Sequence, residues 1–170
     1  MPRNVEIKAA LPNRDAVLAV VKEKSDTGPE TIVQHDVFFR AREGRLKLRI
    51  FDAGRGELIR YEREDVAGPR YSEYQIARTS DPEVLLDILT CTLGRIGEVR
   101  KTRTLYQIGQ TRVHIDQVEG LGDFLELEVV LRPEQTEAEG QRIAQSLLRQ
   151  LGIEKPQFIA EAYVDLLPSS

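Results

Sequence analysis

The sequence predicts one α+β domain built from about eight strands and three or four helices. The length of 170 residues is that of one ordinary domain, so residues 1–170 are expected to fold together. Hydrophobic residues make up 41% of the chain, which is enough for a packed core and unlike the composition of disordered chains. Segments with the period of a strand alternate with segments with the period of a helix.

The first half of the chain predicts one strand, one helix and then three further strands. Residues 5–11 alternate like a strand, and residues 13–24 predict a helix with Asn13 as its cap. One face of this helix is expected to carry Ala16, Val17, Val20 and Val21. Glycine turns then separate three predicted strands, at residues 31–40, 45–51 and 57–64.

The second half predicts four strands and three helices. A strand at residues 71–78 precedes a helix at residues 81–93, in which Cys91 is expected to fill the core. Three strands follow, at residues 98–108, 111–118 and 123–131. Residues 136–152 predict a helix that opens with a capping box, and residues 158–167 predict a short last helix.

Charged side chains take every second position in several predicted strands. Because successive side chains of a strand point to opposite faces, each set lies on one side of its sheet. The sets are Glu6 and Lys8; Lys47 and Arg49; Lys101 and Arg103; Arg112, His114 and Asp116; and Glu126 and Glu128. Two arrangements fit this pattern: an open sheet with its charged face in water, or an antiparallel barrel with a charged lumen and helices packed outside. Solvated faces usually mix Thr, Ser and Gln with charges, so this density of charge favours the barrel.

A lumen that carries both signs of charge suits a ligand that is anionic and bound to a metal ion. Carboxylate oxygens are the ligands that Mg²⁺ and Mn²⁺ prefer, and Lys and Arg neutralise phosphate oxygens. Buried charges without partners cost several kcal/mol each, so such a lumen makes sense mainly around a charged ligand or water. A polyphosphate with a divalent cation meets these demands.

Several motifs resemble those of the CYTH superfamily, the triphosphate tunnel metalloenzymes. Residues 5–8 resemble its ExExK signature, and residues 36–39, 46–49 and 99–103 follow in the order and spacing of the family. The most specific part of the resemblance is the block from Val113 to Glu128. The ending at residues 162–167 is similar to that of class IV adenylyl cyclase-like members. The resemblance covers essentially the whole chain and implies an eight-stranded triphosphate tunnel.

The resemblance also implies which residues form the site. It implies Mg²⁺ or Mn²⁺ as cofactor, with Glu6, Asp116, Glu126 and Glu128 as metal ligands. It implies that phosphates are bound by Lys8, Lys47, Arg49, Arg63, Lys101 and Arg103, with Arg60 as a rival to Arg63. Glu6 and Lys8 are the implied catalytic residues, Lys8 by stabilising the leaving oxygens.

Two reactions fit the implied tunnel, and the sequence leaves both open. A class IV adenylyl cyclase converts ATP to cyclic AMP and pyrophosphate, whereas a triphosphatase hydrolyses inorganic, thiamine or nucleoside triphosphate. The similarity at the C-terminal end favours the cyclase lineage. Asn4 stands where the signature has its first glutamate, which favours hydrolysis and weakens one metal position. A non-catalytic binder of polyphosphate or nucleotide is the third alternative.

The remaining expectations concern partners, location and two histidines. Lys plus Arg number 24 and Asp plus Glu number 28, a balance that argues against a general nucleic-acid binder. The single cysteine excludes an internal disulfide, and the lack of an apolar leader predicts a cytoplasmic protein without membrane contact. The protein is expected to be a monomer or a homodimer. His114 is expected to be a hydrogen-bonding lumen residue or a general base. His35 and Asp36 are expected to point to opposite faces.

Overall fold

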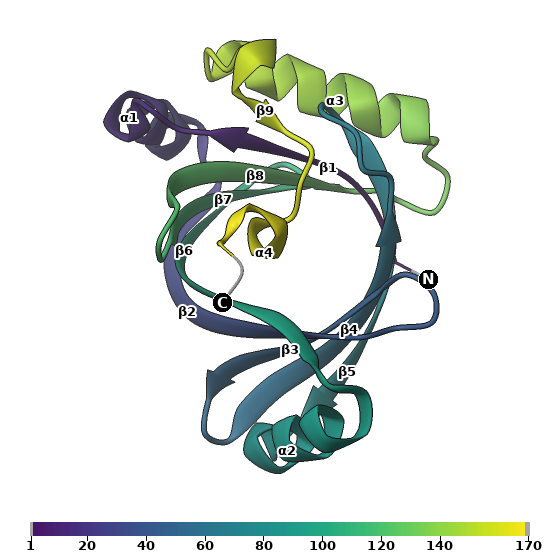
Figure 1. Ribbon diagram of the computed structural model, residues 1–170. Helices are drawn as coiled ribbons and strands as arrows, with labels where there is room; N and C mark the ends of the chain where they lie inside the picture. The colour runs from purple at the N-terminus through teal and green to yellow at the C-terminus, as the bar shows by residue number, and fades with distance from the viewer. Residues whose placement is uncertain (1, 169–170) are drawn as a thin grey trace.

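The computed structural model describes residues 2–168, which contain nine antiparallel strands and four α-helices. Eight of the strands close into one ring, which Figure 1 shows from one of its open ends. In order around the ring they are β1 (Arg3–Ala10), β5 (Arg70–Thr79), β4 (Arg55–Arg63), β3 (Arg45–Asp52), β2 (Thr27–Phe39), β6 (Arg95–Ile108), β7 (Thr111–Val118) and β8 (Gly122–Val130). The predicted closure of eight antiparallel strands is confirmed.

Strand β1 closes the ring because it pairs along both of its edges. One edge pairs with β8 from Asn4 to Ala10, and the first half of the other edge pairs with β5. The ninth strand, β9 (Phe158–Ile159), continues that second edge beside Lys8 and Ala9. Closure pairs the strand edges that an open sheet would expose to other chains.

The apolar core lies outside the ring, between the strands and the helices. The helices are α1 (Arg14–Lys24), α2 (Pro82–Leu93), α3 (Glu137–Gln150) and α4 (Tyr163–Leu166). Helices α1 and α3 pack over one side of the ring, where Val21 and Leu148 share a core with Ile7. Helix α2 covers β2, β3 and β4, and its Leu86 packs against Leu48. Because these apolar side chains point outward, the charged side chains that alternate with them point into the ring. The helices therefore pack outside, as the sequence predicts.

A side-chain cap explains where helix α3 begins but not where helix α1 begins. Helix α3 begins at the predicted capping box, in which the Thr136 hydroxyl accepts a hydrogen bond from the Glu139 backbone and the Glu139 carboxylate accepts one from the Thr136 backbone. Asn13 stands at the cap position of α1, but its side chain makes no hydrogen bond with the helix. Within residues 2–168, no helix has both the length and the apolar composition needed to cross a membrane.

One prediction of a buried side chain is wrong. Cys91 is exposed, because α2 turns toward the ring the face that carries Leu86, about 140° around the helix from Cys91. On the predicted apolar face of α1, Val17 and Val21 are buried while Ala16 is exposed.

The expected helix at residues 158–167 is also wrong. This segment forms β9, a turn and the one-turn helix α4, after a 3₁₀ turn at Lys155–Gln157. The chain crosses one open end of the ring, and Figure 1 shows α4 in front of that end. There Tyr163 is buried, and the centroid of its ring lies 5.1 Å from that of Phe124. Packing on the ring interior overrides the weak helical pattern of the segment.

Candidate active site inside the ring

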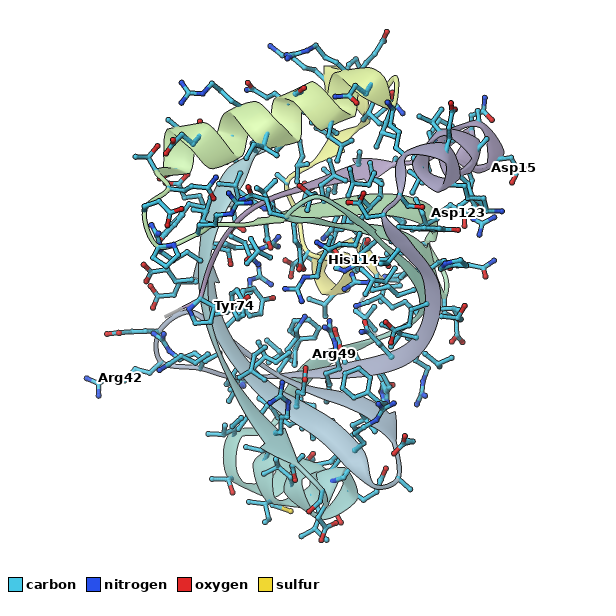
Figure 2. The ribbon with its side chains drawn as sticks, turned by 180° about the vertical axis from the view of Figure 1, so that it is seen from behind. Asp15, Arg42, Arg49, Tyr74, His114 and Asp123 are labelled. Carbon is cyan, nitrogen blue, oxygen red and sulfur yellow. The ribbon has the colours of Figure 1, made fainter. Side chains whose placement is uncertain are left out.

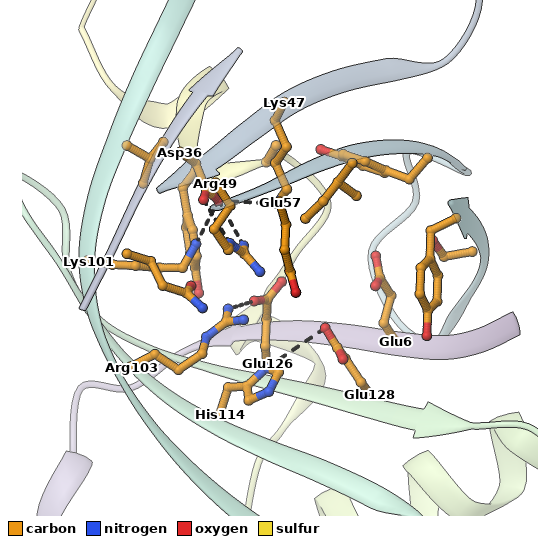
Figure 3. A pocket seen from close by; sticks show the side chains of 18 of the residues that line it. Glu6, Asp36, Lys47, Arg49, Glu57, Lys101, Arg103, His114, Glu126 and Glu128 are labelled. Atoms are coloured by element: carbon orange, nitrogen blue, oxygen red, sulfur yellow. Dashed lines mark hydrogen bonds and ion pairs between the residues drawn. The ribbon is translucent and has the colours of Figure 1, made fainter. Parts of the chain in front are cut away.

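The ring encloses a cavity of about 330 Å³ that is lined by inward-facing side chains of all eight of its strands. Ala162 and Tyr163 line the cavity at the end that α4 covers. The charged side chains of the lining gather in its middle (Figure 3). A volume of this size lies within the usual range for small-molecule sites.

Three cations of the lining share one buried carboxylate, that of Asp36. We call Lys47, Arg49 and Lys101 the basic cluster. Arg49 donates two hydrogen bonds of 2.8 Å to Asp36, while Lys47 and Lys101 lie 3.2 Å and 3.1 Å from it. Burial alone would raise the pKa of Asp36, but Arg49, Lys101 and Lys47 together hold that pKa well below its ordinary value. The sequence pattern gives Asp36 no role in the site, because its position opposite Arg49 appears only once β2 and β3 are paired.

Burial affects the two lysines of the basic cluster strongly. The pKa of Lys101 falls to about 7, first because of burial, with the nearby Arg49 and Arg103 contributing. The pKa of Lys47 is also lowered by burial and by Arg49. Both groups would bind an anion more tightly in their protonated form, so an anion in the cavity should raise both pKa values.

A second group of charges centres on Arg103. This side chain donates two hydrogen bonds of 2.7 Å to Asp116 and a further one to Glu126. Asp116 is fully buried and also accepts a 2.8 Å hydrogen bond from the Tyr163 hydroxyl. Asp116 thus faces inward as predicted but is engaged by Arg103 and Tyr163, so its expected role as a metal ligand stays a prediction.

Three carboxylates lie on the neighbouring strands β1 and β8. We call Glu6, Glu126 and Glu128 the carboxylate trio. Glu6 and Glu128 are direct cross-strand partners, and each member of the trio is less than a fifth exposed. Burial raises the pKa of Glu6, and repulsion from Glu126 and Glu128 raises it further. A cation bound here would relieve that repulsion.

The carboxylate trio suits Mg²⁺ or Mn²⁺ by the chemistry of its oxygens. Among residues 2–168, no three His, Cys, Asp or Glu side chains gather closely enough to enclose a metal ion. Mg²⁺ does not require such a cage, because it usually keeps several waters and binds one or two carboxylates plus substrate phosphates. The donor set therefore fits a metal held jointly with a phosphate ligand.

Two arginines flank Glu6. Arg63 and Arg70 each lie 3.6 Å from its carboxylate, and both are nearly fully buried. Arg60 points outward and pairs with Glu62, so the strand parity favours Arg63 as the inward residue. Arg70 was not among the predicted site residues, although it shares a face of β5 with Ser72, a lining residue.

Lys8 ties the cavity to the C-terminal segment. Its ammonium donates a 3.0 Å hydrogen bond to the Glu161 carbonyl and lies 4.0 Å from the centroid of the Tyr163 ring. It is also 4.0 Å from Glu126. Burial lowers the pKa of Lys8 to about 8, so a substantial part of the population is uncharged above that pH.

The remaining polar residues divide between the two faces of the ring wall. His114 lines the cavity, and burial followed by the charge of Arg103 lowers its pKa to about 3, which leaves it neutral at pH 7. Its Nδ1 is buried and has no hydrogen-bond partner among residues 2–168. The two roles expected of His114, hydrogen bonding in the lumen and general base, stay predictions. His35 points outward to Glu98, at 2.6 Å, while Asp36 points inward, as the sequence predicts. Asn4 lines the cavity and is 4% exposed.

Comparisons with known proteins agree with this architecture. The family model described as the CYTH domain matches residues 2–163. A protein of Methanocaldococcus jannaschii named "putative adenylate cyclase" is 27% identical over 175 residues, which cover 95% of this chain and 97% of that protein.

Solved structures share the fold over nearly the whole chain. The PH1012 protein of Pyrococcus horikoshii is 21% identical, with a TM-score of 0.85 over 97% of this chain and 99% of that one. A protein from Hippeastrum, described as a "putative adenylyl cyclase" with a dominant triphosphatase activity, is 14% identical, with a TM-score of 0.67 over 98% of this chain and 93% of that one. The family match spans the ring and ends at Tyr163, the first residue of α4, and it includes every charged lining residue described above. The chain therefore belongs to the CYTH domain family.

Proposed function

We propose that this protein is a metal-dependent enzyme that binds and cleaves a triphosphate inside the ring. One observation carries the proposal: the carboxylate trio on β1 and β8 faces the basic cluster on β3 and β6 across one cavity of about 330 Å³ (Figure 3). Neither set alone is specific, but the two together match the charges of a triphosphate with a divalent cation.

The basic cluster and Arg103 would bind the phosphate oxygens. Asp36 supports this by keeping the three cations together against their mutual repulsion before any ligand arrives. Groups that are held in place before binding lose little conformational freedom when the ligand binds. Arg49 and Arg103 offer paired donors to phosphate, while the lysines act as point charges.

The carboxylate trio would hold Mg²⁺ or Mn²⁺ together with phosphate oxygens, and Asp116 is a candidate fourth ligand. Bound there, such an ion supplies positive charge to the phosphate oxygens and to the attacking hydroxyl or water. Lys8, in its protonated form, would stabilise the oxygens of the leaving group. Tyr163 and the segment around it would exclude water from the end of the cavity where Lys8 lies.

For the reaction we favour the adenylyl cyclase chemistry, in which the ribose 3′-hydroxyl attacks the α-phosphorus and pyrophosphate leaves. The support is the M. jannaschii relative, which carries the cyclase name. The second candidate is hydrolysis, in which water attacks the γ-phosphorus. It is favoured by the neutral side chain of Asn4 and by the dominant triphosphatase activity described for the Hippeastrum protein.

The test is product analysis with the purified protein. ATP, thiamine triphosphate and inorganic triphosphate are each incubated with Mg²⁺ or Mn²⁺, and the products are separated. Cyclic AMP with pyrophosphate identifies the cyclase, and orthophosphate identifies a triphosphatase and its substrate. Glu126→Gln should abolish the reaction, while Glu62→Gln, an outward-facing carboxylate on β4, should not change it. No product from any substrate, with binding retained, would refute the enzyme and leave a binding protein.

A further inference from the structure

The two ends of the cavity differ, and α4 covers only one of them. Phe38 and Val99 pack with Tyr163 at the covered end. Along β2 the inward positions then continue from Phe38 to Ile32, a span of six residues or about 20 Å. Along β3, Arg45 pairs with Asp165 of α4, so Phe51 lies at the far end of its strand. Figure 2 views the molecule from this second end, which α4 does not cover.

Apolar side chains surround this uncovered end. We call Ile32, Phe51, Ile76 and Leu105 the apolar rim. All four line the cavity, none belongs to a core cluster, and Ile76 is 45% exposed. Ile32 and Phe51 also border a second hollow, of about 720 Å³, that adjoins the cavity on the outside. Apolar side chains do not bind a triphosphate, because phosphate oxygens require cations and hydrogen-bond donors.

Two polar atoms near the rim lack partners. The Asn4 and Gln34 side chains are each 4% exposed, and both line the cavity. Their amide oxygens, Oδ1 and Oε1, are buried and have no hydrogen-bond partner among residues 2–168. Gln34 lies between Ile32 and Asp36 on the inward face of β2, at the boundary between the apolar rim and the charges. A buried acceptor without a donor is costly, so both sites suit a ligand that donates hydrogen bonds.

The geometry points to a subsite for the organic part of the substrate. We infer that the apolar rim holds an aromatic heterocycle, whose N–H or O–H groups donate to Asn4 and Gln34 while its triphosphate lies on the basic cluster. The inference rests on the proposed function. It narrows the substrate to an organic ester of triphosphate and excludes inorganic triphosphate as the preferred substrate. Phe51 offers a ring for stacking, and the guanidinium of Arg55 lies 5.0 Å from the centroid of that ring. A nucleoside and thiamine both have the required chemistry.

The test compares equilibrium binding of ATP, thiamine triphosphate and inorganic triphosphate, each with Mg²⁺, by calorimetry. Phe51→Ala should weaken binding of the heterocyclic ligand about tenfold relative to inorganic triphosphate, since stacking on an aromatic side chain has about that effect on affinity. Ile32→Ala should shift the same ratio in the same direction. Ile96→Ala is the matched control, because Ile96 on β6 is 57% exposed and lines neither the cavity nor the second hollow.

The three ligands separate the outcomes. A shift confined to ATP assigns the subsite to a nucleoside, and a shift confined to thiamine triphosphate assigns it to thiamine. If inorganic triphosphate binds and neither ratio changes, the subsite is refuted while the triphosphate site stands. If the wild type binds none of the three, the proposed function is refuted and the subsite with it. Should Phe51→Ala fail to fold by thermal melting, Ile76→Ala replaces it, because Ile76 is 45% exposed and belongs to no core cluster.

Discussion

Asp36 should be the residue whose charge stabilises this cavity most. Replacing it by Asn keeps the shape of the side chain but removes the negative charge that three cations share, of which Lys101 is buried and the other two are partly buried. The carboxylate oxygen Oδ2 now accepts from Lys47, Arg49 and Lys101. In the variant an NH₂ group takes the place of one oxygen, and it points a donor at a cation.

The magnitude follows from these contacts. Breaking a buried ion pair from one side costs about 3–5 kcal/mol, because the other charge stays buried without compensation. In a domain of this length, 1 kcal/mol shifts the melting temperature by about 2–4 °C, so Asp36→Asn should lower it by roughly 6–20 °C at pH 7. The lysines of the basic cluster can limit the loss by releasing protons, since the pKa of Lys101 is already only about 7.

Thermal unfolding followed by circular dichroism measures this effect. The matched control is Asp52→Asn, which removes an exposed carboxylate 3.4 Å from Arg55. Such a surface pair contributes less than about 1 kcal/mol, so the control should melt within a few degrees of the wild type. If Asp36→Asn melts as the control does, Asp36 does not hold the basic cluster, and the preorganisation of the phosphate site has another cause.

Three further predictions concern the charges around the ligand. Glu6→Gln should abolish turnover and raise the melting temperature at pH 8. Burial and repulsion raise the pKa of Glu6, so the ionised carboxylate costs stability in the folded protein. This gain in melting temperature should vanish below pH 4.5, where Glu6 is protonated in both the folded and the unfolded protein. Glu126→Gln should also abolish turnover, but it should lower the melting temperature. Burial alone would raise the pKa of Glu126, yet the nearby cations, Arg103 above all, hold that pKa well below its ordinary value. Equal changes of melting temperature in Glu6→Gln and Glu126→Gln would contradict this reasoning. At pH 8.5, binding of inorganic triphosphate should take up protons, mainly onto Lys101, seen as a binding enthalpy that differs between Tris and HEPES. The difference should shrink in Lys101→Met without vanishing, because Lys8, with a pKa of about 8, also takes up protons.

The strands and the inward residues could be predicted because they depend on a local rule. Period-two alternation assigns each side chain to one face, and the closed ring turns that face inward. This rule is enough to bring Lys47, Arg49 and Lys101 into one cavity with Glu126. It also resolves Arg63 against Arg60 once the register of β4 is known.

The rest depends on contacts between segments far apart in the sequence. Asp36 gathers its three cations through pairing of β2 with β3 on one side and β6 on the other, which no local pattern states. Residues 158–167 have a helical composition, but docking of Tyr163 on Asp116 and Phe124 breaks the segment into a strand and a short helix. Cys91 was misplaced because the width of a buried helix stripe is set by the surface it packs on.

The carboxylates of the cavity have two different roles, and the difference links the binding of a metal ion to the binding of a triphosphate. Asp36 and Asp116 are almost fully buried, deeper than most of the cations they hold, so a phosphate can bind those cations without displacing them. Glu126 is more exposed and accepts from Arg103 on the cavity side. A phosphate that takes this donor releases Glu126, whose oxygens then become available to a metal ion, and a metal ion that takes Glu126 releases Arg103 for phosphate. Metal and triphosphate should therefore each raise the affinity of the other, through one shared side-chain contact.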